Sequence, residues 1–357
     1  MDLENKISLI KQVGEEILNE EELRHLLQTK DHPIAYDGFE PSGQDIHIAQ
    51  GILRSININK MAKAGVKFKM LVADWHAWAN NKMGGDLERI QTVGKYLIEV
   101  WKHCGMDLNN VEFIWANDFV KDTEYWKKVM QVSRNSTVNR IVRTGQIMGR
   151  KESDVQQASQ ILYPCMQCAD IFQLKADICQ LGMDQRKVNV LARELGPSLG
   201  FWKPVVVSHH MLMGLGEPPK SKDIDRVIDL KMSKSKPDTA IFMNDSEEDI
   251  KRKIGKAYCP AKVTEENPML EYSKYLIFEK FNVMEFNRPE KFGGDLVVEN
   301  YKELERIYAE GKIHPMDLKN SVSHYINKMV NPVREAFHKD QKLKHLLETI
   351  RKFEVTR

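Results

Sequence analysis

The sequence predicts an α/β fold in which a parallel sheet is covered by helices on both faces and is followed by a second, mainly helical domain. Short runs of β-branched and aromatic residues alternate with long stretches of helical periodicity over the first 240 residues, an order that is typical of such a sheet. After about residue 240 the strand-like runs fade while the helical stretches continue. With 357 residues the chain has room for two domains, and we expect them to span 1–240 and 241–357.

The expected elements alternate along the first domain. Helical spacing of apolar residues marks 3–29, a helix from His47 to about Ala64 that Gly65 stops, and a helix within 87–104. Strands are expected at 34–36, 67–73, 111–116 and 205–207, and helices of the second domain at 246–258, 269–281, 301–310 and 316–338. Because ligands of a parallel sheet bind beyond the carboxyl ends of its strands, we expect the residues that follow the strands to meet there: Tyr36, Asp74, His76 and the loop after Val207.

Composition excludes several classes of protein. Hydrophobic residues make up 42% and charged residues 29% of the chain, a balance typical of soluble globular proteins. No apolar run approaches the ~18 residues of a membrane-spanning helix, and the start MDLENKISLIKQ lacks a signal-peptide or transit pattern, so we expect a cytoplasmic protein without membrane contact. Five cysteines without a disulfide rhythm suit a reducing compartment. A net charge of +2 argues against a wholly basic surface but allows a local basic patch.

Two loops raise the question of a phosphate-bearing ligand: PSGQDIHIAQG at 41–51 and KMSKS at 231–235. The chain has no GxxxxGK[ST] and no GxGxxG after a strand. In the first loop His47 begins a helix, and free N–H groups at a helix N-terminus attract anions. Lys231 and Lys234 of the second loop are placed to close over a pyrophosphate and offset its charge as it leaves. Either loop alone is more often an ordinary solvated loop, but together they favour a phosphate site.

These loops also carry a family resemblance. HIAQ resembles a variant of HIGH, and KMSKS matches the second signature, of class I aminoacyl-tRNA synthetases. YDGFEPSG, ADWHAW, YPCMQCAD, GMDQRKVNVLARE and HPMDLKN resemble the tyrosine-specific enzymes of the archaeal and eukaryotic cytosolic branch, from about residue 33 to 335. The resemblance implies a Rossmann-like catalytic domain with a connective insertion at about 117–160, and a helical anticodon-binding domain. It also implies ATP with Mg²⁺, tyrosine and tRNA(Tyr) as reactants, and a homodimer.

The resemblance further implies which residues handle ATP. The catalytic group would be His47, Gln50, Lys231 and Lys234. The ATP and AMP contacts would be Gly38, His47, Asp184, Met211, Leu212, Lys231, Met232, Ser233 and Lys234. The sequence departs from the HIGH pattern because Ala49 and Gln50 replace its glycine and second histidine, and one residue is inserted before His47. Gln50 can still donate a hydrogen bond but carries no charge.

A polar helix face is the candidate amino-acid pocket. Helical spacing puts Tyr163, Gln167 and Asp170 on one face, and their apolar neighbours indicate burial, so a ligand is expected to satisfy these groups. By the resemblance, Tyr163 and Gln167 hold the substrate α-amino group with Gln185 beside it, while Asp170 and Tyr36 meet the phenolic hydroxyl. This pairing favours tyrosine over tryptophan and over phenylalanine. Rejection of phenylalanine by tyrosine-activating synthetases is itself the standard example of selection for a substrate hydroxyl group.

The resemblance places the tRNA contacts elsewhere. Arg186 is expected at the acceptor end, and Phe292, His314 and Asp317 around the first anticodon base. From the residues alone, a hydrophobic staple with an ordinary helix start is the favoured interpretation of the last three, and the resemblance favours the anticodon contact instead. A basic stretch at 134–151 suits phosphate contacts.

The residues argue against three alternative functions. A small-molecule adenylyltransferase would lack the last 110 or so residues, and a non-catalytic RNA-binding paralogue would have lost the lysines or the pocket. The pair Cys165 and Cys168 and the pair His209 and His210 could suggest a zinc site. However, the sequence has no second CxxC and no HxxxH to complete a set of four ligands, so no metal site is expected.

Overall fold

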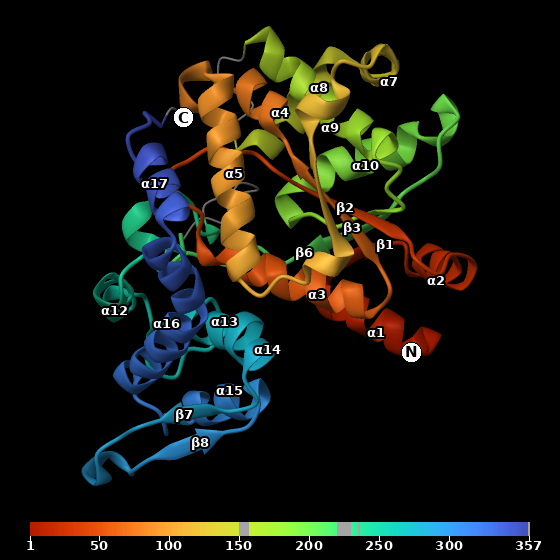
Figure 1. Cartoon of the computed structure of the whole chain (residues 1–357). Helices are drawn as coiled ribbons and strands as arrows, with labels where there is room; N and C mark the ends of the chain where they lie inside the picture. The colour runs from red at the N-terminus through yellow and green to blue at the C-terminus, as the bar shows by residue number, and fades with distance from the viewer. Residues whose placement is uncertain (150–156, 220–229, 235, 356–357) are drawn as a thin grey trace.

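A six-stranded sheet with the order β1-β6-β5-β2-β3-β4 forms the centre of the molecule (Figure 1). The structure is a computed structural model that describes residues 1–149, 157–219, 230–234 and 236–355, and the statements on the fold refer to these residues. The strands are β1 Gly14–Leu18, β2 Ile34–Phe39, β3 Lys67–Val72, β4 Val111–Trp115, β5 Ile178–Cys179 and β6 Val205–His209. From β6 to β4 all neighbours are parallel, which confirms the predicted α/β class.

The strand order reverses beside β2. The chain passes from β2 to β3 and β4 on one side, whereas β5 and β6, which come later in the sequence, lie on the other. Such a reversal leaves the loops of the two halves pointing apart, and ligands of open parallel sheets bind in the crevice between them.

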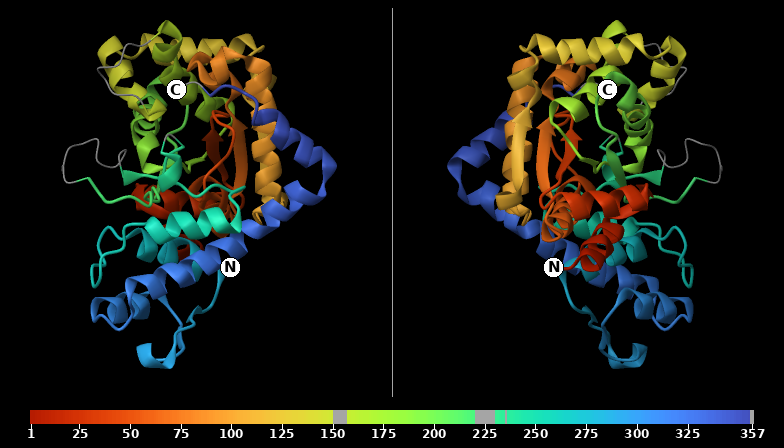
Figure 2. Two further views of the ribbon diagram at one scale, coloured as in Figure 1. Left: turned by 90° about the vertical axis from the view of Figure 1, so that its left-hand side faces the viewer. Right: turned by 90° about the vertical axis from the view of Figure 1, so that its right-hand side faces the viewer.

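Helices cover both faces of the sheet, and alternate strand residues belong to two different cores. Met70 and Val72 pack into the core of the first face, while Leu71 between them packs into the core of the second. The first face carries α1 Leu3–Val13, α3 Arg54–Lys63 and α5 Leu87–His103; the second carries α7 Thr123–Arg134, α8 Val138–Thr144, α9 Ala158–Gln173 and α10 Arg186–Leu195. In Figure 2 the orange α5 and the green α10 lie on opposite sides of the sheet.

The prediction of helix throughout 3–29 was wrong in its middle. The strand β1 separates α1 from α2 Glu20–Thr29 and pairs antiparallel with β6, with Ile17 opposite Val207. Ile17 and Leu18 fit a helical or an extended pattern equally well over so short a stretch. The open edge of β6 decides between them, because an unpaired edge strand offers a row of hydrogen-bonding groups that β1 satisfies.

The part after residue 240 is mainly helical, with a small hairpin at its far end. Its helices are α12 Glu247–Lys256, α13 Pro268–Tyr272, α14 Phe278–Lys280, α15 Tyr301–Ala309, α16 Pro315–Lys339 and α17 Gln341–Ile350. The expectation that strands would fade missed β7 Met284–Phe286 and β8 Leu296–Val298, since three residues are too few to show a period. Figure 1 shows this hairpin far from the central sheet, whereas α17 lies back along α5. No helix of the described residues is both long and apolar enough to cross a membrane.

Candidate active site

A cavity of 970 Å³ opens at the reversal of strand order, beyond the carboxyl ends of β2, β5 and β6. The structure brings to its walls all the residues expected to handle ATP and the amino acid, although these came from six separate segments. They are Tyr36, Gly38, His47, Gln50, Tyr163, Gln167, Asp170, Asp184, Gln185, Met211, Leu212, Lys231, Met232, Ser233 and Lys234. Asp74, which was expected beside them, instead accepts a hydrogen bond from Gln91 of α5 at 2.9 Å.

Helix α9 forms a buried polar floor of the cavity. Tyr163, Gln167 and Asp170 share one face of this helix, and the carboxyl group of Asp170 is completely buried. Its Oδ2 lies 2.9 Å from Nε2 of His76, and its Oδ1 accepts from the hydroxyl of Tyr125 at 3.0 Å. Burial opposes the charged form of His76, but Asp170 outweighs this and raises the pKa of the imidazole above its ordinary value. Asp170 is thus an acceptor that its neighbours hold in place.

Two further contacts shape this floor. Burial, followed by the nearby carboxylate of Asp170, raises the pKa of the Tyr36 phenol well above its ordinary value, so Tyr36 keeps its proton and can donate it in a hydrogen bond. Gln167 donates from Nε2 to Oε1 of Gln185 at 3.0 Å, and Gln185 in turn donates to the carbonyl of Ile147 at 3.0 Å. The amide oxygen of Gln167 is therefore left to accept from a ligand.

His47 also lines the cavity. Its ring is buried and its Nδ1 has no hydrogen-bond partner among the described residues, while its backbone forms a bridge with Phe242. Burial, followed by the charges of Lys234 and Lys231, lowers the pKa of His47 well below its ordinary value. His47 is therefore neutral at physiological pH and acts as a hydrogen-bond donor or acceptor rather than as a cation.

The two lysines of the KMSKS segment differ in their surroundings. Lys231 is ion-paired with Asp184, with 2.7 Å between Nζ and Oδ2. Lys234 has a buried Nζ that finds no hydrogen-bond partner among the residues the structure describes, and burial lowers its pKa to about 8. An unpaired ammonium group beside a neutral imidazole is suited to an anion. Ser235 lies outside the described residues.

This lowered pKa predicts a pH dependence. Lys234 loses its charge as the pH rises through about 8. If the cavity takes ATP, as the sequence resemblance implies, kcat/KM for ATP, which reports on the free protein, should fall above that pH. Lys234→Arg keeps its proton throughout this range. We expect the decline above pH 8 to disappear in the arginine variant. The same decline in both proteins would assign it to another group.

A glycine lets two walls of the cavity approach each other. A Cβ atom added to Gly182 would lie 2.4 Å from Sδ of Met211 and 2.7 Å from Oδ1 of Asp184. A side chain here would therefore first displace the side chains of Met211 and Asp184, two residues of the cavity wall.

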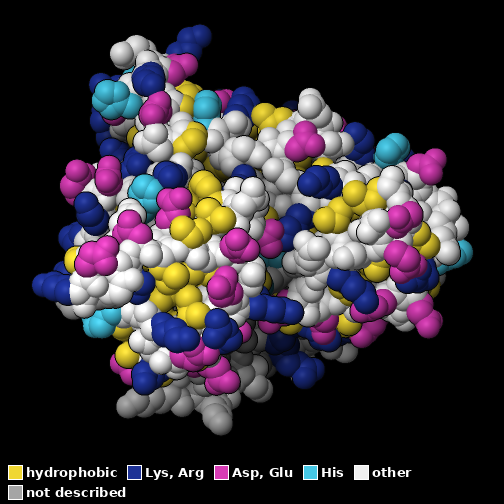
Figure 3. All heavy atoms as spheres, turned by 90° about the horizontal axis from the view of Figure 1, so that it is seen from below, with side chains coloured by type: hydrophobic (Ala, Val, Ile, Leu, Met, Phe, Trp, Pro, Cys, Tyr) yellow, Lys and Arg dark blue, Asp and Glu magenta, His cyan; other side chains and the backbone are white. Residues whose placement is uncertain are grey.

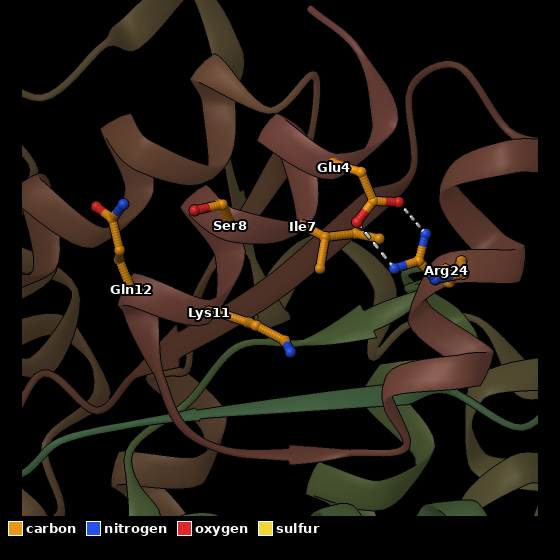
Figure 4. Close-up of a pocket in the computed structure, with 6 residues that line it drawn as sticks. All are labelled: Glu4, Ile7, Ser8, Lys11, Gln12 and Arg24. Carbon is orange, nitrogen blue, oxygen red and sulfur yellow. Dashed lines mark hydrogen bonds and ion pairs between the residues drawn. The ribbon is translucent and has the colours of Figure 1, made fainter.

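A smaller hollow of 350 Å³ lies between α1 and α2, away from the sheet's carboxyl edge (Figure 4). Its charged residues already have partners: Arg24 is paired with Glu4, and Lys11 with Glu20. It therefore offers no group comparable to Lys234.

Comparison with known proteins decides the family. The family model described as "tRNA synthetases class I (W and Y)" matches residues 28–331. The chain belongs to this family.

The relatives of this synthetase include tyrosine enzymes of plants and archaea. "Tyrosine--tRNA ligase 1, cytoplasmic" of Arabidopsis thaliana is 48% identical over 359 residues, which cover 100% of this chain and 90% of the relative. "Tyrosine--tRNA ligase" of Thermococcus kodakarensis is 42% identical, with 100% of both chains covered. The crystal structure of the Pyrococcus horikoshii tyrosyl-tRNA synthetase complexed with L-tyrosine gives a TM-score of 0.91 at 39% identity, covering 98% of this chain and 100% of that one. These similarities confirm the resemblance found in the sequence.

Sequence analysis missed a buried ion pair in the wall of this synthetase. Nε of Arg54 lies 2.9 Å from Oδ2 of Asp37, its guanidinium lies 5.5 Å from the ring centroid of Trp101, and its Nη1 has no hydrogen-bond partner within the described part of the chain. Arg54 begins α3 seven residues after His47, and the π-helical turn Ala49–Leu53 lies between them, so α-helical spacing from His47 would not have placed it. The guanidinium of Arg54 adds a permanent positive charge to the cavity wall, whereas the side chain of Gln50 in the same wall is uncharged.

The residues expected to contact tRNA lie outside the synthetase cavity. Arg186 begins α10 and is ion-paired with Glu16, with 2.7 Å between Nε and Oε2. His314 caps α16 by accepting from the backbone N–H of Met316 at 3.2 Å, and Asp317 follows in the first turn. Phe292 ends a short turn of the hairpin, and its side chain lies outside the described residues.

The cysteine and histidine pairs do not converge in the synthetase. Nδ1 of His209 lies 2.7 Å from Nε2 of Gln180. His210 lies 3.1 Å from both Glu15 and Glu271; these carboxylates outweigh the effect of burial and raise its pKa to about 9. Among the residues whose structure is described, no group of three or more His, Cys, Asp or Glu side chains could hold a metal ion.

Proposed function

We propose that the chain is a tyrosine–tRNA ligase. It would join tyrosine to ATP as tyrosyl-adenylate with release of pyrophosphate, and then transfer the tyrosyl group to the 3′-terminal ribose of tRNA(Tyr). The observation that carries the proposal is the polarity of the cavity: its walls hold a fixed carboxylate among phenols, and also the ammonium of Lys234, which has no hydrogen-bond partner among the described residues, near the neutral His47. The relatives named for tyrosine at 39–48% identity support it.

The first step needs positioning more than a protein nucleophile. A carboxylate oxygen of tyrosine attacks the α-phosphorus of ATP, the new oxygen–phosphorus bond forms, and the bond to the β-phosphate bridging oxygen breaks. His47, Lys231 and Lys234 would meet the charge that grows on the phosphates. In the structure Lys231 is paired with Asp184, so this ion pair would have to open as the phosphates arrive. Mg²⁺ would enter bound to the triphosphate, whose oxygens are hard ligands.

The amino acid would lie with its phenol on Asp170 and Tyr36. Asp170 accepts and Tyr36 donates, so both sides of the substrate hydroxyl would be satisfied. The α-amino group would be held by Tyr163 and by the unused oxygen of Gln167. A substrate without the hydroxyl leaves the buried carboxylate unpaired.

The second substrate would extend from the cavity to the far hairpin. The acceptor end of tRNA would pass Arg186, while the anticodon would reach Phe292, His314 and Asp317. Figure 3 shows Lys and Arg side chains interspersed with Asp and Glu over the face seen from below, so binding would rely on particular residues more than on a single basic field.

Asp317→Ala tests the anticodon assignment. A carboxylate can accept from N1 and N2 of guanine together, which no other base offers. We expect the variant to raise KM for tRNA about tenfold and to weaken the preference for guanine as the first anticodon base. ATP–pyrophosphate exchange should be unchanged, because the cavity is far from α16's first turn. Unaltered preference among anticodon variants would contradict the assignment.

The homodimer is proposed from exposed apolar side chains. Met130 of α7, Val138 of α8 and Leu162 of α9 are exposed, and Trp78 of α4 Asp74–Ala79 is 47% exposed. These elements lie together in Figure 1, and such groups commonly mark an interface. We predict a mass in solution of twice the 41.4 kDa of one chain, measured by light scattering. The single-chain mass at micromolar concentration would contradict this.

We also propose, from the plant relative's name, that the enzyme is cytoplasmic.

A further inference from the structure

The segment after α17 reaches the cavity from the C-terminal part of the chain. Leu343, Leu347 and Ile350 of α17 are buried in the same core as α5, and Figure 1 shows the two helices side by side. Beyond Ile350 the chain runs to the loop that precedes His47, and Val355 lines the cavity. The motifs that carry the family resemblance end at about residue 335, so residues 341–355 lie beyond all of them.

Gln44 binds this segment to the loop. Its Nε2 donates to the carbonyl of Arg351 at 3.0 Å and to that of Phe353 at 2.6 Å. The guanidinium of Arg89 lies over the ring of Phe353, 5.7 Å from its centroid. Because both hydrogen bonds go to backbone carbonyls, they depend on the path of the segment.

The neighbours of Gln44 contact the catalytic groups. A Cβ atom on Gly43 would lie 3.1 Å from Cδ of Lys234, so this part of the loop touches the lysine side chain. On the other side, Asp45 accepts from the hydroxyl of Tyr96 at 2.6 Å, and the Tyr96 ring meets Phe337 of α16 edge-on at 5.2 Å. The loop that leads into His47 is therefore held by residues 351–353 through Gln44, and by Tyr96 of α5, which packs against Phe337.

We propose that residues 351–355, through Gln44, position the loop 42–46 for ATP, so that this segment is part of the nucleotide site. The proposal rests on the proposed function. Gln44 is a positioning residue that acts through the loop on His47 and Lys234. Gly43 leaves the loop with a flexible backbone, and without the two hydrogen bonds the loop would have to be ordered when ATP binds, which opposes binding.

A double-mutant cycle tests this in ATP–pyrophosphate exchange. The variants are a chain ending at Ile350, Gln44→Ala, and the two combined, with Gln12→Ala on the exposed side of α1 as the control. We expect KM for ATP to rise about tenfold in each of the first two, since each loses two hydrogen bonds, and KM for tyrosine to change by less than about twofold. The combined variant should match the shortened chain, because both changes remove the same bonds. Direct ATP binding, measured by calorimetry, should weaken in parallel.

Three results would overturn the proposal: an unchanged KM for ATP in the shortened chain, fold-changes that multiply in the combined variant, or a parallel rise in KM for ATP and tyrosine, as general loosening would cause. Failure of the proposed function would look different, because the unmodified chain would then show no tyrosine-dependent exchange. The calorimetric comparison of ATP affinity would still decide the role of the segment.

Discussion

Replacing Lys231 and Lys234 together by alanine is expected to lower the rate of tyrosyl-adenylate formation by roughly 10²–10³-fold or more, while tyrosine affinity stays nearly the same. Both ammonium groups line the cavity, whereas Asp170 contacts His76 and Tyr125. The two lysines would meet charge that is greatest on the phosphates in the transition state, so their loss should appear in kcat rather than in binding of the amino acid. Single-turnover formation of the adenylate measures this.

A matched control removes the same charge elsewhere. Lys251 and Lys256 are exposed on α12, and replacing both by alanine should leave the rate within about twofold. Equal losses of tyrosine binding and turnover in the Lys231 and Lys234 variant would rule out a role of these lysines at the phosphates, because a distorted pocket lowers binding and turnover together.

Asp170→Asn is expected to weaken tyrosine binding by about 1–3 kcal/mol and to raise exchange with phenylalanine relative to tyrosine. The carboxylate accepts from Tyr125 and faces Nε2 of His76, so an amide must turn its one oxygen to some partners and its NH₂ to others. The amide can still touch the phenol, which makes the loss partial. Phenylalanine then no longer leaves a buried charge unpaired, so it is penalised less.

Two measurements accompany this variant. Because Asp170 raises the pKa of His76, the pKa of that imidazole should fall in Asp170→Asn, which NMR titration would detect. Tyr125→Phe is the control, since Tyr125 touches Asp170 from outside the cavity and its loss should preserve selectivity. If exchange with phenylalanine stays undetectable and tyrosine kinetics are unchanged, Asp170 does not meet the hydroxyl.

Local patterns predicted the parts of the site that depend on neighbours in sequence. The α9 face is one helix, so the spacing of Tyr163, Gln167 and Asp170 was enough to place them together. The ends of parallel strands must meet at one edge, so the position of Tyr36 also followed.

Contacts between distant segments could not be predicted in this way. Tyr125 reaches Asp170 across 45 residues of sequence, and Gln44 reaches Phe353 across 309. β1 forms because β6 has an open edge, and the ion pair of Lys231 with Asp184 forms because two loops pack together. The residue pattern of one segment does not indicate which distant segment it will contact, because these contacts depend on how the whole chain packs.

ATP–pyrophosphate exchange by the purified chain, with each of the twenty amino acids in turn, tests the proposed function. We predict exchange that requires tyrosine, with phenylalanine and tryptophan far behind, because only tyrosine pairs the hydroxyl with Asp170 and Tyr36. Exchange dependent on tryptophan, exchange that needs no amino acid, or none with any of the twenty would contradict the assignment of this cavity to tyrosine activation.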